Sequence, residues 1–234
     1  NLFTGFANTG DSVHHVTVIG SGNSVSHATK TIVIGDNRNL DTVTGAVVIG
    51  NATTATPVKA ANNSVTIGSD SLATFQSGVA IGNTASSSGS NAIAMGTNSK
   101  AATLNTVAIG NTATATSMGG VAIGNTSTAS SANATAVGTN TIAKGASSVA
   151  IGNNATATTT GGVAIGSGSV ADTWYGLKSY DPSTKTISTD TSATWMSTAS
   201  AVSVGDADEG ITRQITGVAA GWKDTDAVNV AQLK

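Results

Sequence analysis

A short apolar triplet followed by glycine recurs along the chain at a nearly fixed interval. Eleven such glycines occur, and seven of the ten intervals between them are fourteen residues, without a slip from Gly68 to Gly166. Apolar alternation over three residues is typical of a short β-strand, and a short, strict period is typical of a stacked solenoid. The pattern therefore predicts an all-β solenoid of about 14-residue coils with parallel strand pairing, and not a globular domain with one pocket.

The coil in which Gly110 follows the apolar triplet illustrates the expected arrangement of strands and turns. Val107 and Ile109 point to one side of a strand and Ala108 to the other. The glycine supplies a corner with positive φ, and a second short strand follows, with small residues three and five positions after the glycine. We expect the large aliphatic pair and these small residues to line the coil interior. The residues assigned to this core are Val79, Ile81, Val107, Ile109, Val121, Ile123, Val149, Ile151, Val163 and Ile165.

The middle residue of each triplet then faces outward and forms a stripe of small apolar side chains. A long exposed apolar stripe is a contact surface by default, and small side chains allow two backbones to approach closely. Two aliphatic side chains are also a small core for fourteen ordered residues. We therefore predict a homo-oligomer, with a monomer bearing a plain Ala/Thr surface as the alternative. The predicted interface residues are Ala80, Ala94, Ala108, Ala122, Ala136, Ala150 and Ala164.

Two segments break the period. Between Gly50 and Gly68 the interval grows to eighteen residues, and the additions, which include Pro57 and Lys59, predict a surface loop. A longer break at residues 172–200 holds half of the chain's aromatic residues. We expect a capping insert that covers the open end of the rod with aromatic packing, and an aromatic recognition surface is the alternative. The triplet and glycine then return once more, ending at Gly205.

Composition narrows the function. Charged residues make up 9% of the chain, aromatic residues 3%, and the net charge is −2. Scattered lysines and arginines leave no basic stripe for nucleic acid. The sequence shows no apolar run of about 18 residues, no signal peptide and no cysteine. The absence of cysteine fits an exported bacterial surface protein, so the sequence is interpreted as a fragment without its targeting and anchoring parts.

Histidines give no sign of a metal site or of catalysis. His14, His15 and His27 lie near the N-terminus without acidic residues or cysteines at ligand spacing. No nucleophile elbow, catalytic triad or phosphate-binding loop occurs. We therefore predict that the protein is not an enzyme and needs no cofactor or metal.

The one acidic cluster precedes the C-terminal tail. It consists of Asp206, Asp208 and Glu209. We expect a solvated loop, and the functional alternative is ion pairing with Arg213 or Lys223 of a neighbouring chain.

The repeated Val-Ala-Ile-Gly, often preceded by asparagine as at Asn105, resembles the head of YadA-type trimeric autotransporter adhesins. The tail, from Arg213-Gln214-Ile215-Thr216-Gly217 to Asn229-Val230-Ala231-Gln232-Leu233, resembles the neck of that family. The family pattern is broken at Thr17 and Thr135, where a valine is expected. The neck residues that the resemblance assigns are Arg213, Gln214, Asp226, Asn229, Val230 and Leu233.

The resemblance implies a left-handed parallel β-roll in which three chains form one head. The implied domains are a head over residues 1–171, an aromatic-bearing insert with the last coil over 172–204, and a neck leading into a coiled-coil stalk over 205–234. A C-terminal barrel, absent from this fragment, would anchor the protein in the bacterial outer membrane.

The expected function is attachment, at the bacterial cell surface, to host matrix proteins, to host cells or to other bacteria. Many weak, repeated sites would act together through avidity. An ice-binding solenoid or a purely structural spacer is the alternative, since threonines recur in rows, although Ser87, Lys100 and Ile142 interrupt them. A left-handed helix acyltransferase would need a hexapeptide-based coil and a catalytic histidine, and neither is seen.

Overall fold

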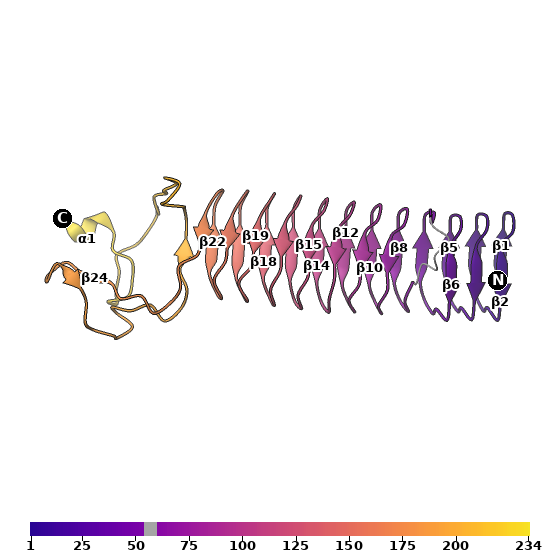
Figure 1. Cartoon of the computed structure of the whole chain (residues 1–234), viewed down its shortest axis with the longest axis horizontal. Coiled ribbons are helices and arrows are strands. Elements are labelled where there is room, and N and C mark those ends of the chain that lie inside the picture. Colours follow the sequence, from indigo (N-terminus) through magenta and orange to yellow (C-terminus); the bar gives the residue numbers. More distant parts are fainter. Residues whose placement is uncertain (54–59) are drawn as a thin grey trace.

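A computed structural model describes residues 1–53 and 60–234, which form an elongated parallel β-solenoid followed by an irregular C-terminal region (Figure 1). One side of the solenoid is a 13-stranded parallel sheet to which each coil contributes one strand. Its strands, in spatial order, are β1 (Leu2–Thr4), β3 (Thr17–Ile19), β5 (Ile32–Ile34), β7 (Val47–Ile49), β8 (Val65–Ile67), β10 (Val79–Ile81), β12 (Ile93–Met95), β14 (Val107–Ile109), β16 (Val121–Ile123), β18 (Thr135–Val137), β20 (Val149–Ile151), β22 (Val163–Ile165) and β26 (Val202–Ser203).

The opposite side of the solenoid consists of two shorter parallel sheets. The N-terminal one contains β2 (Thr9–Asp11), β4 (Ser24–Ser26) and β6 (Asn39–Asp41). The eight-stranded one contains β9 (Leu72–Ala73), β11 (Ser86–Ser87), β13 (Lys100–Ala101), β15 (Thr114–Ala115), β17 (Thr128–Ala129), β19 (Ile142–Ala143), β21 (Thr156–Ala157) and β23 (Val170–Ala171). Beyond the last coil lie the antiparallel hairpin of β24 (Tyr180–Asp181) and β25 (Thr186–Ile187) and the short helix α1 (Val230–Leu233).

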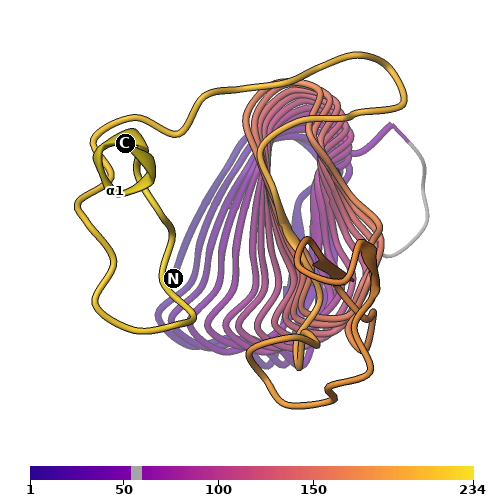
Figure 2. The ribbon, with the colours of Figure 1, turned by 90° about the vertical axis from the view of Figure 1, so that its left-hand side faces the viewer.

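The strand register confirms the predicted repeat. Val107 pairs with Val121, fourteen residues later, and Val149 pairs with Val163 in the same way. Seen along the axis, successive coils superpose, while the C-terminal segment that carries α1 leaves the roll to one side (Figure 2). The solenoid fold expected from the sequence is thus the fold observed.

The corner glycines are fixed by two independent constraints. Gly110 has a φ of +135°, a conformation that side-chain-bearing residues rarely adopt. A Cβ atom added there would lie 2.3 Å from the carbonyl oxygen of Gly124 in the next coil. The predicted role of glycine at the corner is confirmed, and close stacking of the corners adds to it.

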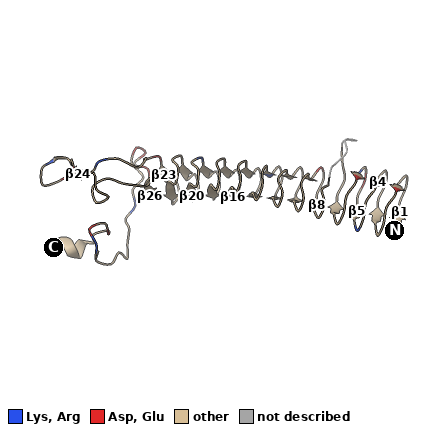
Figure 3. Cartoon of the chain, turned by 90° about the horizontal axis from the view of Figure 1, so that it is seen from below, with Lys and Arg blue, Asp and Glu red and all other residues tan. Residues whose placement is uncertain are grey.

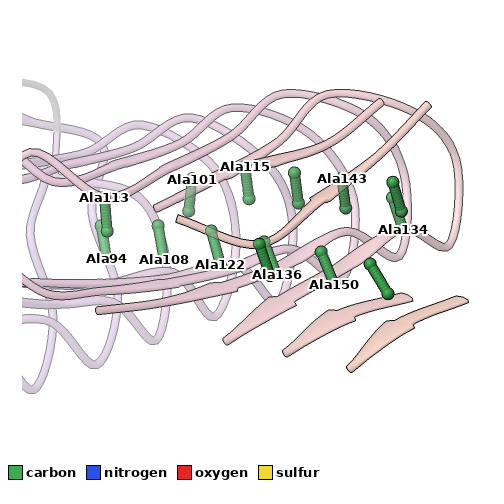
Figure 4. Close-up of a cluster of buried hydrophobic side chains, with 14 of the residues drawn as sticks. Ala94, Ala101, Ala108, Ala113, Ala115, Ala122, Ala134, Ala136, Ala143 and Ala150 are labelled. Carbon is green, nitrogen blue, oxygen red and sulfur yellow. The ribbon is translucent and has the colours of Figure 1, made fainter. Parts of the chain in front are cut away.

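The interior of the 14-residue coils is lined by alanine, which corrects the predicted core. Ala108, together with Ala113 and Ala115 from the second strand, is fully buried (Figure 4). The small residues predicted on the second strand are therefore inside, as expected. The aliphatic residues predicted to lie with them are not, because β10, β14, β16, β20 and β22 each bury only their middle residue. Such a narrow coil has no space for a valine and an isoleucine as well.

The same finding overturns the predicted alanine interface. Every residue assigned to it is 0% exposed within one chain and thus unavailable to a partner: Ala80, Ala94, Ala108, Ala122, Ala136, Ala150 and Ala164. The predicted core residues are the ones that face outward: Val79, Ile81, Val107, Ile109, Val121, Ile123, Val149, Ile151, Val163 and Ile165.

The first coils are longer and enclose larger side chains. Thr17 pairs with Ile32, fifteen residues later, and Val18 takes the buried middle position that alanine has elsewhere. Val25 and Leu40 from the second strands complete this cluster. The coils with one more residue therefore enclose valine and leucine, whereas the 14-residue coils enclose mainly alanine, serine and threonine.

Both ends of the solenoid extend the predicted repeat. Strand β1, before Gly5, adds a coil that sequence reasoning missed, and β26 pairs with β22 as the triplet before Gly205 predicts. The predicted loop with Pro57 and Lys59 lies outside the described residues. The insert before β26 does not form the expected aromatic cap within one chain, because Trp174 and Tyr175, although paired edge to face, are more than half exposed.

Candidate assembly and adhesion surfaces

The outward residues of the 13-stranded sheet form a mainly apolar surface, interrupted by Thr4, Thr17 and Thr135, which we call the aliphatic stripe. It consists of the first and third residues of each strand, such as Val107 and Ile109. Exposure at its isoleucines reaches 36% at Ile123, 41% at Ile151 and 45% at Ile165. In-register pairing places each of these side chains directly above its equivalent in the next coil. The stripe therefore runs in two parallel columns along the rod, the arrangement of a contact surface.

The opposite sheet presents a polar face. Thr114, Thr128 and Thr156 point outward from β15, β17 and β21 in one row. Lys100 and Ile142 interrupt that row, as the sequence predicts. Ser87 does not, because it is fully buried inside its coil. Charged residues are sparse along the roll (Figure 3), so recognition on this face would rest on hydroxyl, amide and methyl groups.

Asparagines bridge successive coils at the corners. Asn91 Nδ2 donates to Asn105 Oδ1 at 3.3 Å, and Asn140 Nδ2 donates to Asn154 Oδ1 at 2.7 Å. All four of these residues have φ between 54° and 57°. Asparagine tolerates this left-handed conformation better than most residues do. Asparagines before the triplet, such as Asn91 and Asn105, and before the second strand, such as Asn140 and Asn154, thus shape turns and link neighbouring coils.

A buried arginine marks the change from long coils to short ones. Arg38 is fully buried, and its guanidinium donates to the carbonyl oxygens of Gly50, at 2.6 Å, and Gly68, at 2.9 Å. Burial lowers the pKa of Arg38, and the negative charge of Asp70 opposes that shift. In the preceding coils Asn8 and Asn23 make the corresponding bonds to Gly20 and Gly35.

The predicted histidines remain on the surface. His27 Nδ1 lies 2.9 Å from Asp41 Oδ1 of the next coil, and both side chains are more than half exposed. The hydrogen bond and the charge of Asp41 raise the pKa of His27. His14 and His15 are exposed too. Within residues 1–53 and 60–234, no group of three or more histidine, aspartate or glutamate side chains is arranged to hold a metal ion.

The predicted neck residues take several positions. Arg213 docks on the end of the roll, where its guanidinium donates to the Ser167 and Val204 carbonyls and to Ser169 Oγ. The guanidinium of Arg213 is therefore bound within its own chain. This differs from the alternative in which Arg213 pairs with the acidic cluster of a neighbouring chain. Lys223 also lies at this end, and its backbone amide donates to Asp226.

The rest of the neck is held by hydrogen bonds instead of a core. Asp226 accepts from the amides of Trp222 and Lys223, which lowers the pKa of its carboxyl. Asn229 caps α1. Helix α1 buries none of its residues, and Val230 and Leu233 are exposed. Gln214 is exposed as well. In the described part of the chain, no helix combines the length and the apolar content needed to cross a bilayer.

Comparison with known proteins agrees with this geometry. The profile of the YadA head domain repeat matches residues 76–99, 87–113, 104–127, 115–141 and 143–169. The profile described as the coiled stalk of trimeric autotransporter adhesins matches residues 214–234. The crystal structure of the collagen-binding domain of the Yersinia adhesin YadA is similar in fold, with a TM-score of 0.57 and 35% identity, over 73% of this chain and 80% of that one.

The chain belongs to the trimeric autotransporter adhesin family. Among curated members, it is 60% identical over 65 residues to the autotransporter adhesin BadA of Bartonella henselae. It is 74% identical over 38 residues to the trimeric autotransporter adhesin AtaA of Acinetobacter sp. strain Tol 5. These matches cover 28% and 16% of this chain, but only 2% and 1% of the two adhesins. The head-repeat pattern and the C-terminal tail recognised in the sequence are therefore those of this adhesin family.

Proposed function

We propose that the chain forms a homotrimer in which the aliphatic stripes of three copies meet along the rod axis. The supporting observation is the stripe itself. Summed over the coils, it exposes on the order of 1,000 Å² of apolar surface, more than the roughly 300–600 Å² of the largest patch on a typical monomer. With an interior of alanine, the coils gain little from burial alone, and burying the stripes of three chains would supply the missing core.

We propose further that the trimer is an adhesive head displayed on the outer surface of a bacterium. Its binding would come from the polar face, repeated coil after coil and presented three times around the axis, so that weak contacts combine through avidity. The proposed ligand is a host matrix protein or a cell surface, and the name of the YadA structure makes collagen the first candidate. This function involves no catalytic step and no cofactor. Residues 1–171 would form the head, 172–204 the insert and last coil, and 205–234 the neck and the start of the stalk.

Ice binding is the weaker candidate. It would require a flat, unbroken threonine array, and Lys100 and Ile142 interrupt the row on the polar face. The family comparisons favour adhesion over it, and a thermal-hysteresis assay distinguishes the two.

The proposed function is tested by binding of the purified chain to immobilised collagen, fibronectin, laminin and whole cells. Light scattering on the same sample gives the mass of the species that binds. The matched control is the Ile109→Glu, Ile123→Glu double variant, which places charge in the stripe and leaves the polar face intact. We expect the trimer to bind and the variant, as a monomer, to lose avidity. Equal binding by the trimer and the monomeric variant would exclude avidity. A monomeric mass for the wild-type chain in light scattering would refute the proposed assembly.

A further inference from the structure

The insert before the last coil exposes an unusual amount of apolar surface. Trp174 is 53% exposed and Tyr175 58%, and Leu177, Tyr180 and Ile187 are each 57–58% exposed. Large side chains such as these present about 100 Å² each at that exposure, or roughly 500 Å² together. A patch of this size marks an interaction site unless something covers it.

These side chains are held in place and do not belong to a loose loop. The insert closes at its base, where the Ala201 amide donates to the Thr173 carbonyl at 3.1 Å. Farther from the roll, the Gly176 amide donates to the Ser197 carbonyl oxygen at 2.8 Å. The antiparallel pairing of Tyr180 with Ile187 then orders the tip. The patch is therefore a defined surface, built on a frame of backbone hydrogen bonds.

A second set of uncovered apolar residues lies at the same end of the rod. Val202, in the last strand of the 13-stranded sheet, is 65% exposed and continues the aliphatic stripe. In the neck, Ile215 is 70% exposed, Val228 58% and Val230 68%. Figure 1 shows the β24–β25 hairpin and α1 both extending past the last coil. Within one chain, neither segment has a core of its own.

We infer that residues 174–187 form a collar that packs on a second copy of this chain, at the C-terminal end of its roll and on its neck. This inference rests on the proposed trimer and assigns the insert a place in it. Val202 follows the insert and continues the stripe, so three rolls that meet along their stripes bring three inserts and three necks to the same end of the assembly. Each copy would then cover apolar surface that its neighbour leaves exposed.

A free ligand is the competing occupant. A cavity of about 330 Å³ in the insert is lined by Trp195, two carboxylates and several hydroxyls, groups that suit a saccharide. However, Asp181 already accepts two hydrogen bonds from Ser183, and Asp190 accepts one from Ser192. Of the exposed apolar side chains of the insert, Ile187 lines this cavity, but Trp174, Tyr175, Leu177 and Tyr180 do not.

Photo-crosslinking identifies the occupant. Benzoylphenylalanine replaces Trp174 in the 234-residue chain, and in a matched control it replaces Thr189, an exposed polar residue of the same insert. Light scattering first establishes the mass of each sample. We expect irradiation of the trimer to give covalent dimers and trimers on a denaturing gel from position 174, and few from position 189.

A second measurement does not depend on crosslinking chemistry. The chain has no cysteine, so Leu177→Cys and Thr189→Cys each introduce a single thiol. We expect maleimide to label position 177 at least about tenfold more slowly than position 189 in the trimer, because reaction there requires local opening. The protection should disappear in the monomeric stripe variant.

The outcomes separate this inference from the proposed function. A trimer that shows neither crosslinks from position 174 nor protection at position 177 overturns the collar and leaves the trimer intact. A monomer overturns both. Labelling at position 177 that stays fast, together with protection of position 189 only when a glycan mixture is added, overturns the collar in favour of a ligand bound in the cavity that Thr189 lines.

Discussion

Replacing Ala108 with valine would test the alanine core most directly. Ala108 is 0% exposed, and its neighbours in the same column, Ala94 and Ala122, are buried equally. Valine adds two carbon atoms and keeps the β-propensity of the strand high. Any destabilisation would therefore come from lack of space, and not from a weaker strand.

The size of the change in stability caused by Ala108→Val follows from the packing of the coil interior. If the interior could accept the two carbons, their burial would stabilise the chain by about 1.6 kcal/mol at about 0.8 kcal/mol per methylene. A single coil cannot widen without moving its strands out of line with the strands to which they are hydrogen-bonded in both neighbouring coils, so we expect overpacking to cost about 1–3 kcal/mol instead. The substitution should therefore lower the free energy of unfolding, whereas at a site with free space it would raise it.

Unfolding followed by circular dichroism, combined with hydrogen exchange, measures this effect. Because a repeat protein loses stability locally, exchange should rise first in the coils that contain Ala94, Ala108 and Ala122. Ala102→Val is the matched control, since it makes the same chemical change just after β13, at a partly exposed position. The control should stay within about 0.5 kcal/mol of the wild type. If the two variants unfold alike, Ala108 does not lie in a closed interior.

Four further outcomes follow from the structure. Ile109→Glu should convert the trimer to a folded monomer, because three charges would meet in the stripe; a trimeric mass in light scattering would contradict this. Gly110→Ala should lower stability by at least about 1–3 kcal/mol, since its φ of +135° and the Gly124 carbonyl both disfavour a Cβ atom; unchanged thermal unfolding would contradict it. The raised pKa of His27 means that its pairing with Asp41 stabilises the fold below about pH 6.5 and that this contribution is lost as pH rises through the raised pKa. In an NMR titration, Asp41→Asn should return the pKa of His27 toward 6.5, and an unmoved pKa would assign the shift to another cause. Arg213→Ala removes the bonds to Ser167, Ser169 and Val204, so hydrogen exchange should rise in the last coil, and exchange equal to the wild type would show that the docking contributes nothing.

The repeat could be predicted from the sequence because it depends on local chemistry. A corner that requires glycine, such as Gly110, recurs once per coil, and its spacing alone gives the coil length. The extra coil of β1 was missed because Phe3 and Thr4 replace the usual small and aliphatic residues before Gly5.

The inside and outside of the coil could not be assigned from alternation. Alternation separates Ala108 from Val107 and Ile109, but it does not say which side is enclosed. A signal was present in the lengths of the coils. The middle residue is valine in the 15-residue coils, as at Val18, and alanine in the 14-residue coils from Ala80 to Ala164, with Thr66 at the change between them. A side chain whose size follows the size of its coil is one that the coil encloses.

The exposure of the apolar residues at the C-terminal end could not be predicted from the sequence either. Trp174 and Tyr175 could cap the roll or face outward, and their sequence neighbours do not decide between the two. The difference depends on how the backbone of the insert closes between Thr173 and Ala201, which is a contact across most of the insert.

The direction of the coil-to-coil hydrogen bonds has a mechanical consequence. These bonds lie along the rod axis, so a tensile force along the rod stretches every bond of one coil boundary at the same time. Such a rod should yield at the boundary with the fewest bonds. Strand β26 pairs with β22 over two residues, while most neighbouring strands of that sheet pair over three. Within the 13-stranded sheet, traction would therefore first open the last boundary, next to the insert and the docked side chain of Arg213.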